Sequence, residues 1–257
     1  MRAKRTGDGP RQEVALIQLL PNMLTVAAIC AGVTAIRIGV QGDYLRAVQL
    51  ILIAGVLDGL DGRIARLLRS TSEIGAELDS LADFLNFGVA APIVVYFWGL
   101  QDLRGAGWLA VLIFAICGVM RLARFNVSAR APDKDGPGAY FEGLPSPAGA
   151  VLAMLPMYAS FAVPGLGMLP APVIALWLVV VGGLMISSLP VWSFKTTRIY
   201  RKNVKFFLLG FACVAAALAI FTWSALVVMC LAYVVVVIRA ALIGRPAPKP
   251  EDTGEES

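Results

Sequence analysis

Histidine is absent from the 257-residue sequence. This absence excludes a histidine general base, a phosphohistidine intermediate and histidine metal ligands, and it leaves carboxylates, lysines, hydroxyls and backbone oxygens for those roles. Cysteine is scarce as well, with four residues: Cys30, Cys117, Cys213 and Cys230. All four lie in apolar runs and none forms a Cys-x-x-Cys pair, so we interpret them as small packing residues rather than as redox or zinc groups.

Charged residues are also few, at 15% of the chain, whereas hydrophobic residues make up 58% and the mean hydropathy is +0.77. Soluble domains contain about 45–50% apolar residues. The composition therefore predicts an integral membrane protein, in the form of an all-α, polytopic helix bundle. The net charge of +5 does not indicate a nucleic-acid partner, because the lysines and arginines lie in short loops between apolar runs.

About eight segments have the length and composition of membrane helices, which need about 20 apolar residues each. They are 21–40, 44–67, 76–99, 106–125, 146–163, 170–189, 206–221 and 224–243. The proline-rich region from 145 to 190 predicts kinked helices. Residues 14–20 are too short to span a membrane and are interpreted as an interfacial turn. The expected domain limits are a disordered basic N-terminus (1–13), a transmembrane domain (14–243) and a disordered tail (244–257).

The basic residues predict the orientation. If the N-terminus is cytoplasmic, all but three of the 22 lysines and arginines fall on the cytoplasmic side, and the exceptions are Arg37, Arg46 and Arg104. This asymmetry supports eight spans with both termini in the cytoplasm, as in a bacterial-type inner membrane. It also places the acidic stretch that follows residue 57 at the cytoplasmic surface.

Four aspartates stand out in that stretch. Asp58 and Asp61 are spaced i, i+3, and Asp79 and Asp83 are spaced i, i+4, so each pair shares one face of its helix. A short connection around 69–75 makes the two helices antiparallel neighbours. Four adjacent carboxylates need cations, and hard divalent ions such as Mg²⁺, Mn²⁺ or Ca²⁺ suit all-oxygen ligands. Two such ions suit attack at phosphorus. The alternative is a set of helix-end salt bridges with Arg63, Arg66 and Arg69.

The stretch reads D58-G-L-D61-G62-R-I-A65-R66, then eight residues, then G75-A-E-L-D79-S-L-A-D83. This resembles, at each of eight fixed positions, the CDP-alcohol phosphatidyltransferase signature D-x2-D-G-x2-A-R-x8-G-x3-D-x3-D. The resemblance covers residues 21–190 and implies a six-helix core followed by two further helices. It implies that Asp58, Asp61, Asp79 and Asp83 hold two Mg²⁺ or Mn²⁺ ions, Ca²⁺ also being compatible, and that Asp83 is the catalytic base.

Within that family the chain is most similar to the membrane-embedded phosphatidylserine synthases. The similar stretches are "LLPNMLTVAAICAG" (19–32), "DSLADFLNFGVAAP" (79–92), "MRLARFNV" (120–127) and "FEGLPSPAGA" (141–150). The resemblance implies transfer of the phosphatidyl group from CDP-diacylglycerol to L-serine, with release of CMP. It also implies contact with membrane lipids and a homodimer formed through transmembrane helices.

The candidates for binding CDP-diacylglycerol follow from the signature and from the first predicted helix. Gly62 and Ala65 are small enough for the nucleotide to approach the backbone, and Arg66 suits a diphosphate. The full set is Gly62, Ala65, Arg66, Ser72, Gly75, Asn22 and Thr25. The alternatives are helix packing for Gly62 and Ala65, the start of a helix for Gly75, and helix capping for Asn22 and Thr25.

Serine would need a cation for its carboxylate and an acceptor for its ammonium group. The candidates are Arg121, Arg124, Asn126, Lys195 and Arg198. The alternative for the basic residues is that they anchor anionic lipid headgroups. The stretch "FEGLP" (141–145) is placed by resemblance near the pocket.

Two other functions are compatible with parts of the pattern. The same reaction with inositol phosphate, glycerol phosphate or choline would use the same signature, and a phosphorylated alcohol would call for a denser basic pocket. An ion-coupled transporter or channel would explain acids in a membrane. However, an inverted-repeat transporter predicts a second acidic segment, and the only acid between Tyr140 and Ile243 is Glu142.

Overall fold

The computed structural model describes residues 16–68, 70, 72–130, 141–163, 165, 167–187, 190–191 and 204–243. Nearly all of them are helical. The elements are η1 (Leu16–Leu19), α1 (Leu20–Val40), α2 (Tyr44–Leu67), α3 (Glu73–Asp83), η2 (Phe84–Ala90), α4 (Ala91–Gly99), η3 (Gln101–Leu103), α5 (Gly105–Arg130), β1 (Phe141–Glu142), α6 (Ser146–Ala153), α7 (Leu155–Ala162), α8 (Ala171–Ile186), β2 (Pro190–Val191), α9 (Val204–Ile220) and α10 (Thr222–Ile243).

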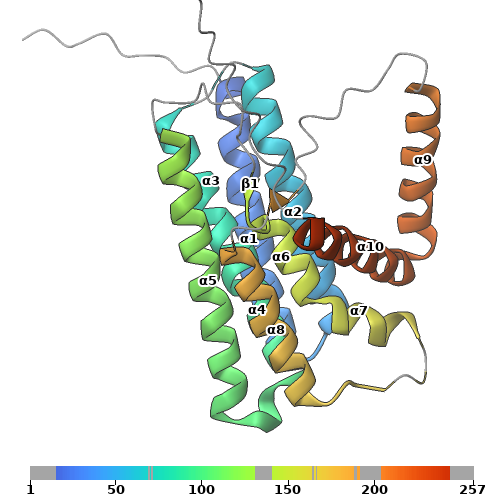
Figure 1. The fold of residues 1–257 in the computed structure, drawn as a ribbon. Helices are drawn as coiled ribbons and strands as arrows, with labels where there is room; N and C mark the ends of the chain where they lie inside the picture. Colours follow the sequence, from blue (N-terminus) through green and yellow to red (C-terminus); the bar gives the residue numbers. More distant parts are fainter. Residues whose placement is uncertain are drawn as a thin grey trace, which may run out of the picture.

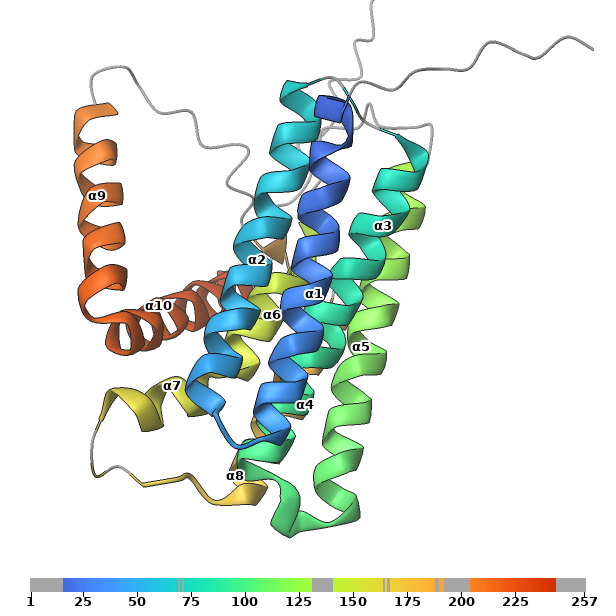
Figure 2. The ribbon, with the colours of Figure 1, turned by 180° about the vertical axis from the view of Figure 1, so that it is seen from behind.

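The prediction of an all-α helix bundle is confirmed. Helices α1, α2, α5 and α8 run side by side with the continuous helix formed by α3, η2 and α4, as Figure 1 shows from one side and Figure 2 from the other. Each of the eight predicted segments is helical, and α2 has the predicted limits. The terminal segments 1–13 and 244–257 lie outside the described residues, so their predicted disorder stays a prediction.

Small residues bring the first two helices together. Ala28 and Ala35 of α1 and Ala47 and Ala54 of α2 are fully buried. Small side chains let backbones approach closely, which favours helix association where lipid supplies no hydrophobic drive. The first two helices therefore form a close antiparallel pair, and this pair positions Asp58 and Asp61 beside α1.

Two irregularities interrupt the helices of the bundle, and one of them was predicted. The kink in the proline-rich region is confirmed, because α6 ends at Ala153 and α7 begins at Leu155, next to Pro156, which has no N–H to donate. The other was not predicted: the third predicted helix, 76–99, is not an α-helix throughout. Instead it passes at Phe84 into the π-helical turn η2, in which the Ala91 N–H donates to the Asn86 carbonyl.

The last two helices lie outside the main bundle. Figures 1 and 2 show α10 lying across the bundle and α9 standing apart from it. Trp223 of α10 stacks near Tyr158 of α7 and contacts Phe161 edge to face. A short antiparallel pair, which was not expected, joins β1 to β2 through Phe141–Val191 and Glu142–Pro190.

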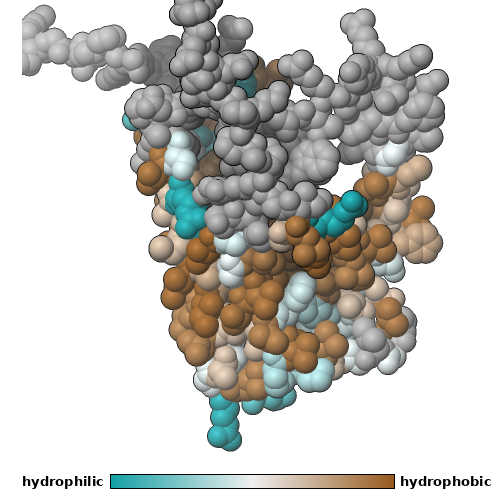
Figure 3. All heavy atoms as spheres, in the orientation of Figure 1, coloured by the Kyte–Doolittle hydropathy of each residue, from teal (hydrophilic) through white to brown (hydrophobic). Residues whose placement is uncertain are grey.

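The apolar surface fits a membrane protein. Within the described ranges, four helices are long and apolar enough to cross a membrane: Leu20–Val40, Glu73–Gly99, Gly105–Ser128 and Thr222–Leu242. Figure 3 shows apolar side chains over most of the described part of one face. The structure therefore supports an integral membrane protein, while the count of eight spans stays a prediction.

Candidate active site

The four signature aspartates converge at one end of the bundle. One carboxylate oxygen each from Asp58, Asp61 and Asp79 lies within 4.8 Å of the other two. Asp83 lies within hydrogen-bonding reach of Asp58 and completes the group. The antiparallel arrangement of α2 and α3, joined by a short connection, produces this cluster as the spacing predicts.

The carboxylates have little neutralising charge around them. In the described part of the chain, no arginine lies within salt-bridge distance of any of the four, and one oxygen each of Asp58, Asp61 and Asp83 is buried without a hydrogen-bond partner. Buried charges are stable only when they are paired, protonated or bound to a cation. The alternative of helix-end salt bridges with Arg63 and Arg66 is therefore wrong, and Arg69 lies outside the described residues.

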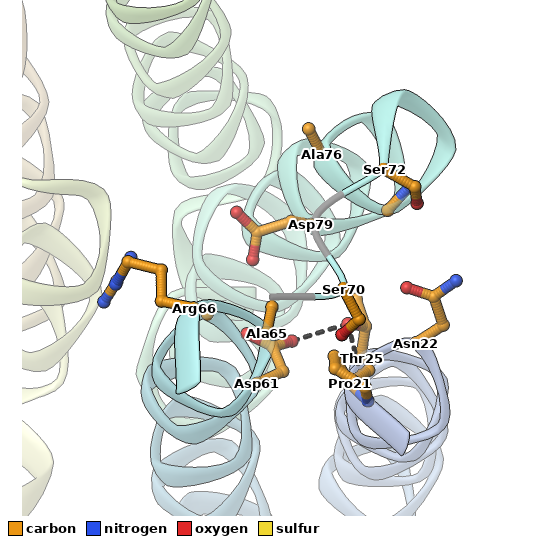
Figure 4. Close-up of a pocket in the computed structure, with 12 residues that line it drawn as sticks. Pro21, Asn22, Thr25, Asp61, Ala65, Arg66, Ser70, Ser72, Ala76 and Asp79 are labelled. Atoms are coloured by element: carbon orange, nitrogen blue, oxygen red, sulfur yellow. Dashed lines mark hydrogen bonds between the residues drawn. The ribbon is translucent and has the colours of Figure 1, made fainter. Parts of the chain in front are cut away.

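Thr25 fixes the orientation of Asp61. Its hydroxyl lies 2.5 Å from Asp61 Oδ2 and 3.1 Å from the Pro21 carbonyl oxygen, one turn back in α1. Both Thr25 and Asp61 are buried, and Figure 4 shows the bond crossing from α1 to α2. The capping alternative for Asn22 and Thr25 is wrong, because the N-cap position of α1 is Leu19.

An open pocket of about 210 Å³ adjoins Asp61 and Asp79. It lies between the first turns of α1, the end of α2 and the start of α3 (Figure 4). Its lining residues are Pro21, Asn22, Thr25, Asp61, Gly62, Ala65, Arg66, Ser70, Ser72, Gly75, Ala76 and Asp79. All seven residues predicted to contact CDP-diacylglycerol are in this set, so the structure brings them together around one cavity.

The start of α3 forms one wall of the pocket. Ser72 is the N-cap, and its Oγ accepts a hydrogen bond of 3.0 Å from the Gly75 N–H. A Cβ atom at Gly75 would lie 2.9 Å from Asn22 Oδ1 and 3.0 Å from Ser72 Oγ. Gly75 therefore does more than begin the helix, because its lack of a side chain keeps the α1 and α3 walls in place.

The end of α2 forms the opposite wall. Gly62 has space around it, since a Cβ atom there would meet only the flexible Arg66 guanidinium, at 3.8 Å. Helix packing therefore does not explain this glycine. Arg66 is exposed, and Figure 4 shows its guanidinium extending away from Asp61 and Asp79. The side chain is free to approach a ligand that extends beyond the pocket.

A buried arginine lies on the other side of the carboxylates. Arg121 of α5 is only 9% exposed, and its Nη1 donates a 2.9 Å hydrogen bond to Ser146 Oγ at the start of α6. Its guanidinium also lies 5.6 Å from the Phe125 ring centroid and interacts electrostatically with Asp83. The cation is held by packing and hydrogen bonding at the interior end of the cluster.

The other predicted serine contacts have different surroundings. Arg124 is exposed and donates a 3.1 Å hydrogen bond to the Ile186 carbonyl near the end of α8. The Asn126 amide donates a 3.1 Å hydrogen bond to Ser80 Oγ, which ties α5 to α3. Lys195 and Arg198 lie outside the described residues. Of the three candidates within the described residues, Arg121 is the one that interacts electrostatically with an aspartate of the cluster.

The donor set fits a hard divalent cation. All the candidate ligands are carboxylate oxygens from two helices, and three of these aspartates present a buried oxygen without a partner. Mg²⁺, Mn²⁺ and Ca²⁺ prefer such ligands, and no nitrogen or sulfur donor is among them. The cluster therefore suits metal binding better than any other use of four adjacent aspartates.

Comparison with known proteins supports the same interpretation. Residues 18–185 match the CDP-alcohol phosphatidyltransferase family. The chain belongs to this family. It is 38% identical over 231 residues to the CDP-diacylglycerol–serine O-phosphatidyltransferase of Mycobacterium leprae, an alignment that covers 87% of this chain and 75% of the relative. It is 35% identical over 193 residues to the enzyme of the same name from Helicobacter pylori, covering 75% and 78% of the two chains.

The family match ends before α9 and α10, in agreement with a family core followed by two further helices. Two residues at the site, Ser70 and Ser146, were not predicted from the sequence. Ser70 lines the pocket with a buried hydroxyl, and Ser146 pairs with Arg121. The available signals were that Ser70 lies in the eight-residue spacer of the signature and that Ser146 lies between two prolines. Neither position by itself specifies a contact.

Proposed function

We propose that this protein transfers the phosphatidyl group of CDP-diacylglycerol to the hydroxyl of L-serine, forming phosphatidylserine and CMP. The observation that carries the proposal is the cluster of Asp58, Asp61, Asp79 and Asp83 beside a pocket lined by the rest of the signature. The names of the relatives support serine as the acceptor. The reaction is a step of phospholipid biosynthesis.

The four aspartates would hold divalent ions, Mg²⁺ or Mn²⁺, with two ions as the expected number. When bound, such ions would offset the negative charge of the diphosphate and of the transition state. Neighbouring residues of the protein hold in place the carboxylates that would bind these ions. Thr25 holds Asp61 toward the pocket, and the packing of α2 against α1 and α3 keeps the other carboxylates close together.

The nucleotide end of the lipid would occupy the open pocket. Gly62, Ala65 and Gly75 leave room for it, and Asn22 and Ser72 offer polar groups at its rim. Arg66 is free to donate charge-assisted hydrogen bonds to the diphosphate. The acyl chains would remain in the lipid that surrounds the apolar face of the bundle (Figure 3).

Serine would enter on the Arg121 side. Its hydroxyl oxygen attacks the phosphorus attached to diacylglycerol, the new P–O bond forms, and the bond to CMP breaks. Asp83 receives the hydroxyl proton. Arg121, which lies near Asp83 and is fixed by Ser146, would bind the serine carboxylate. Arg124, Asn126, Lys195 and Arg198 remain further candidates around this acceptor position.

The active site and both termini are proposed to face the cytoplasm. The described parts of the structure support this orientation. Arg37 at the end of α1, Arg46 at the start of α2 and Arg104 between η3 and α5 lie at the end of the bundle opposite the end of α2 and the start of α3 (Figure 1). The expected assembly is a homodimer in a bacterial-type inner membrane. The domain limits proposed are 14–243 for the membrane domain, with 1–13 and 244–257 as flanking segments.

A panel of alcohols tests the proposal. Purified protein in detergent micelles is incubated with CDP-diacylglycerol, Mn²⁺ or Mg²⁺, and one alcohol at a time, and CMP release is measured. We expect release with L-serine. Release with inositol phosphate, glycerol phosphate or choline but not with serine would assign a different acceptor. Movement of ions across sealed vesicles without CMP release would instead favour a transport function.

A further inference from the structure

Asn86 is an amide buried without partners. Its side chain has 0% exposure, and neither Oδ1 nor Nδ2 has a hydrogen-bond partner among the described residues. A buried polar group without a partner typically costs about 1–3 kcal/mol. An amide in that position needs a partner that the described residues do not supply.

The surroundings of Asn86 are built to accept its side chain. It lies in the π-helical turn η2, three residues after Asp83 and toward the interior of the bundle. Gly32 of α1 is its neighbour, and a Cβ atom at Gly32 would collide with Asn86 Oδ1. A π-helical turn interrupts regular helix geometry and often occurs at functional sites. The absence of a side chain at Gly32 leaves the amide its space between α1 and η2.

The carboxylate cluster, whose Asp83 lies three residues before Asn86 on the same continuous helix, holds further polar atoms without partners among the described residues. Asp58, Asp61 and Asp83 each have one buried oxygen that accepts no hydrogen bond from the described residues. Asp83 belongs to the same continuous helix as Asn86. The amide can donate two hydrogen bonds and accept others, whereas a carboxylate accepts only. Asn86 therefore has the donors that these oxygens lack.

We propose that Asn86 is a positioning residue for the carboxylate cluster, hydrogen-bonded through buried water to the oxygens of Asp83 and Asp58 that no described residue satisfies. The inference rests on the metal site of the proposed function. No direct hydrogen bond joins the amide to these aspartates among the described residues, so the proposed link is water-mediated. Buried waters occur where two to four polar partners converge. Groups that hydrogen-bond to metal-binding side chains orient those side chains, and loss of such a group typically lowers metal affinity by about 10- to 100-fold.

Asn86→Leu tests this role, with Tyr158→Phe as the matched control. Leucine approximates the shape of asparagine without its hydrogen bonds. Tyr158 is likewise buried with a hydroxyl that has no partner among the described residues, but it lies on α7, away from the cluster. Mn²⁺ binding is measured from the electron paramagnetic resonance signal of the free ion, for each purified protein in micelles. Thermal unfolding is measured without divalent ions.

We expect Asn86→Leu to raise the Kd for Mn²⁺ by about 10- to 100-fold, and Tyr158→Phe to leave it unchanged. Without divalent ions, both variants should melt at or above the wild-type temperature, because each loses a polar group that has no partner in the protein. Wild-type Mn²⁺ affinity in Asn86→Leu would overturn the proposal. So would a lower melting temperature of this variant, since the amide would then serve the fold itself. Failure of wild-type protein to bind Mn²⁺ would refute the metal site as well.

Discussion

The two sides of the carboxylate cluster differ in exposure and in origin. The side proposed to bind the nucleotide is an open pocket formed by residues close in sequence, from Asp61 to Asp79, together with the start of α1. The side proposed to bind the acceptor is buried, and it combines Asp83 with Arg121 of α5 and Ser146 of α6. The open side suits a lipid nucleotide, whose tails must stay in the membrane, and the buried side suits a small polar acceptor.

The difference implies that the two substrates bind on opposite sides of the carboxylate cluster and contact different residues. Residues on the open side should affect the requirement for CDP-diacylglycerol, and residues on the buried side should affect the requirement for serine. Asp58, and Asp83 as the proposed base, should affect the chemical step. Substitutions on each side test whether the division is real.

The largest expected effect belongs to Asp83→Asn. Asparagine preserves the shape but cannot take the serine proton, and loss of a general base typically costs about 10²- to 10⁴-fold in rate. We expect CMP release to fall by that factor while binding of CDP-diacylglycerol remains measurable. Asp102→Asn, at the opposite end of the bundle in η3, is the control. Near-normal turnover by Asp83→Asn would refute its assignment as base.

Arg121→Ala should have the next largest effect. A charge-assisted hydrogen bond contributes about 1.5–3 kcal/mol, so the KM for serine should rise by about 10- to 100-fold while the KM for CDP-diacylglycerol changes little. Arg124→Ala is the comparison, because Arg124 is exposed and bonded to the Ile186 carbonyl. Its effect on the serine KM should have the same direction and be smaller. Equal KM changes for both substrates in Arg121→Ala would contradict a separate acceptor side.

Gly75→Ala should have a moderate effect confined to the open side. The new Cβ atom would lie 2.9 Å from Asn22 Oδ1 and displace that side chain at the pocket rim. We expect the KM for CDP-diacylglycerol to rise several-fold with the serine KM unchanged. Gly183→Ala in α8 is a suitable control, because a Cβ atom there meets nothing within 4 Å. A change in the serine KM alone would place Gly75 on the wrong side of the site.

The smallest effect is expected for Ser72→Ala. This substitution removes the N-cap bond to the Gly75 N–H, and loss of a serine N-cap typically costs about 1 kcal/mol. Thermal unfolding in micelles should show a small decrease in melting temperature that Ser128→Ala, an exposed position in α5, does not show. If Ser72 also contacts the nucleotide, its variant will raise the KM for CDP-diacylglycerol as well. An unchanged melting temperature would contradict the capping role.

The open side could be predicted from the sequence because its residues are close along two helices. The i, i+3 and i, i+4 spacings of the aspartates fix their faces, and a short connection fixes the antiparallel packing of α2 and α3. The limits of α2 were also predicted correctly, and in the structure Asp43 caps its start. Local periodicity and turn chemistry were sufficient here.

The buried side could not be predicted in the same detail. The bond between Arg121 and Ser146 joins residues 25 positions apart, and the pattern of either segment alone does not specify it. In the sequence, Arg121 and Arg124 were equivalent candidates. Their spacing did not show that Arg121 is buried and Arg124 is exposed. The π-helical turn at Phe84 depends on packing against α1 and α5, so an apolar run gave no sign of it.

Product stoichiometry tests the central claim most directly. Purified protein is supplied with CDP-diacylglycerol, isotope-labelled L-serine and Mn²⁺, and labelled phosphatidylserine and CMP are quantified by mass spectrometry. We predict equal amounts of the two products, abolished by a chelator and restored by added Mn²⁺. Phosphatidylserine formed at an undiminished rate in the presence of the chelator, or CMP released without any labelled phosphatidylserine, would contradict a carboxylate-bound metal site that transfers the phosphatidyl group to serine.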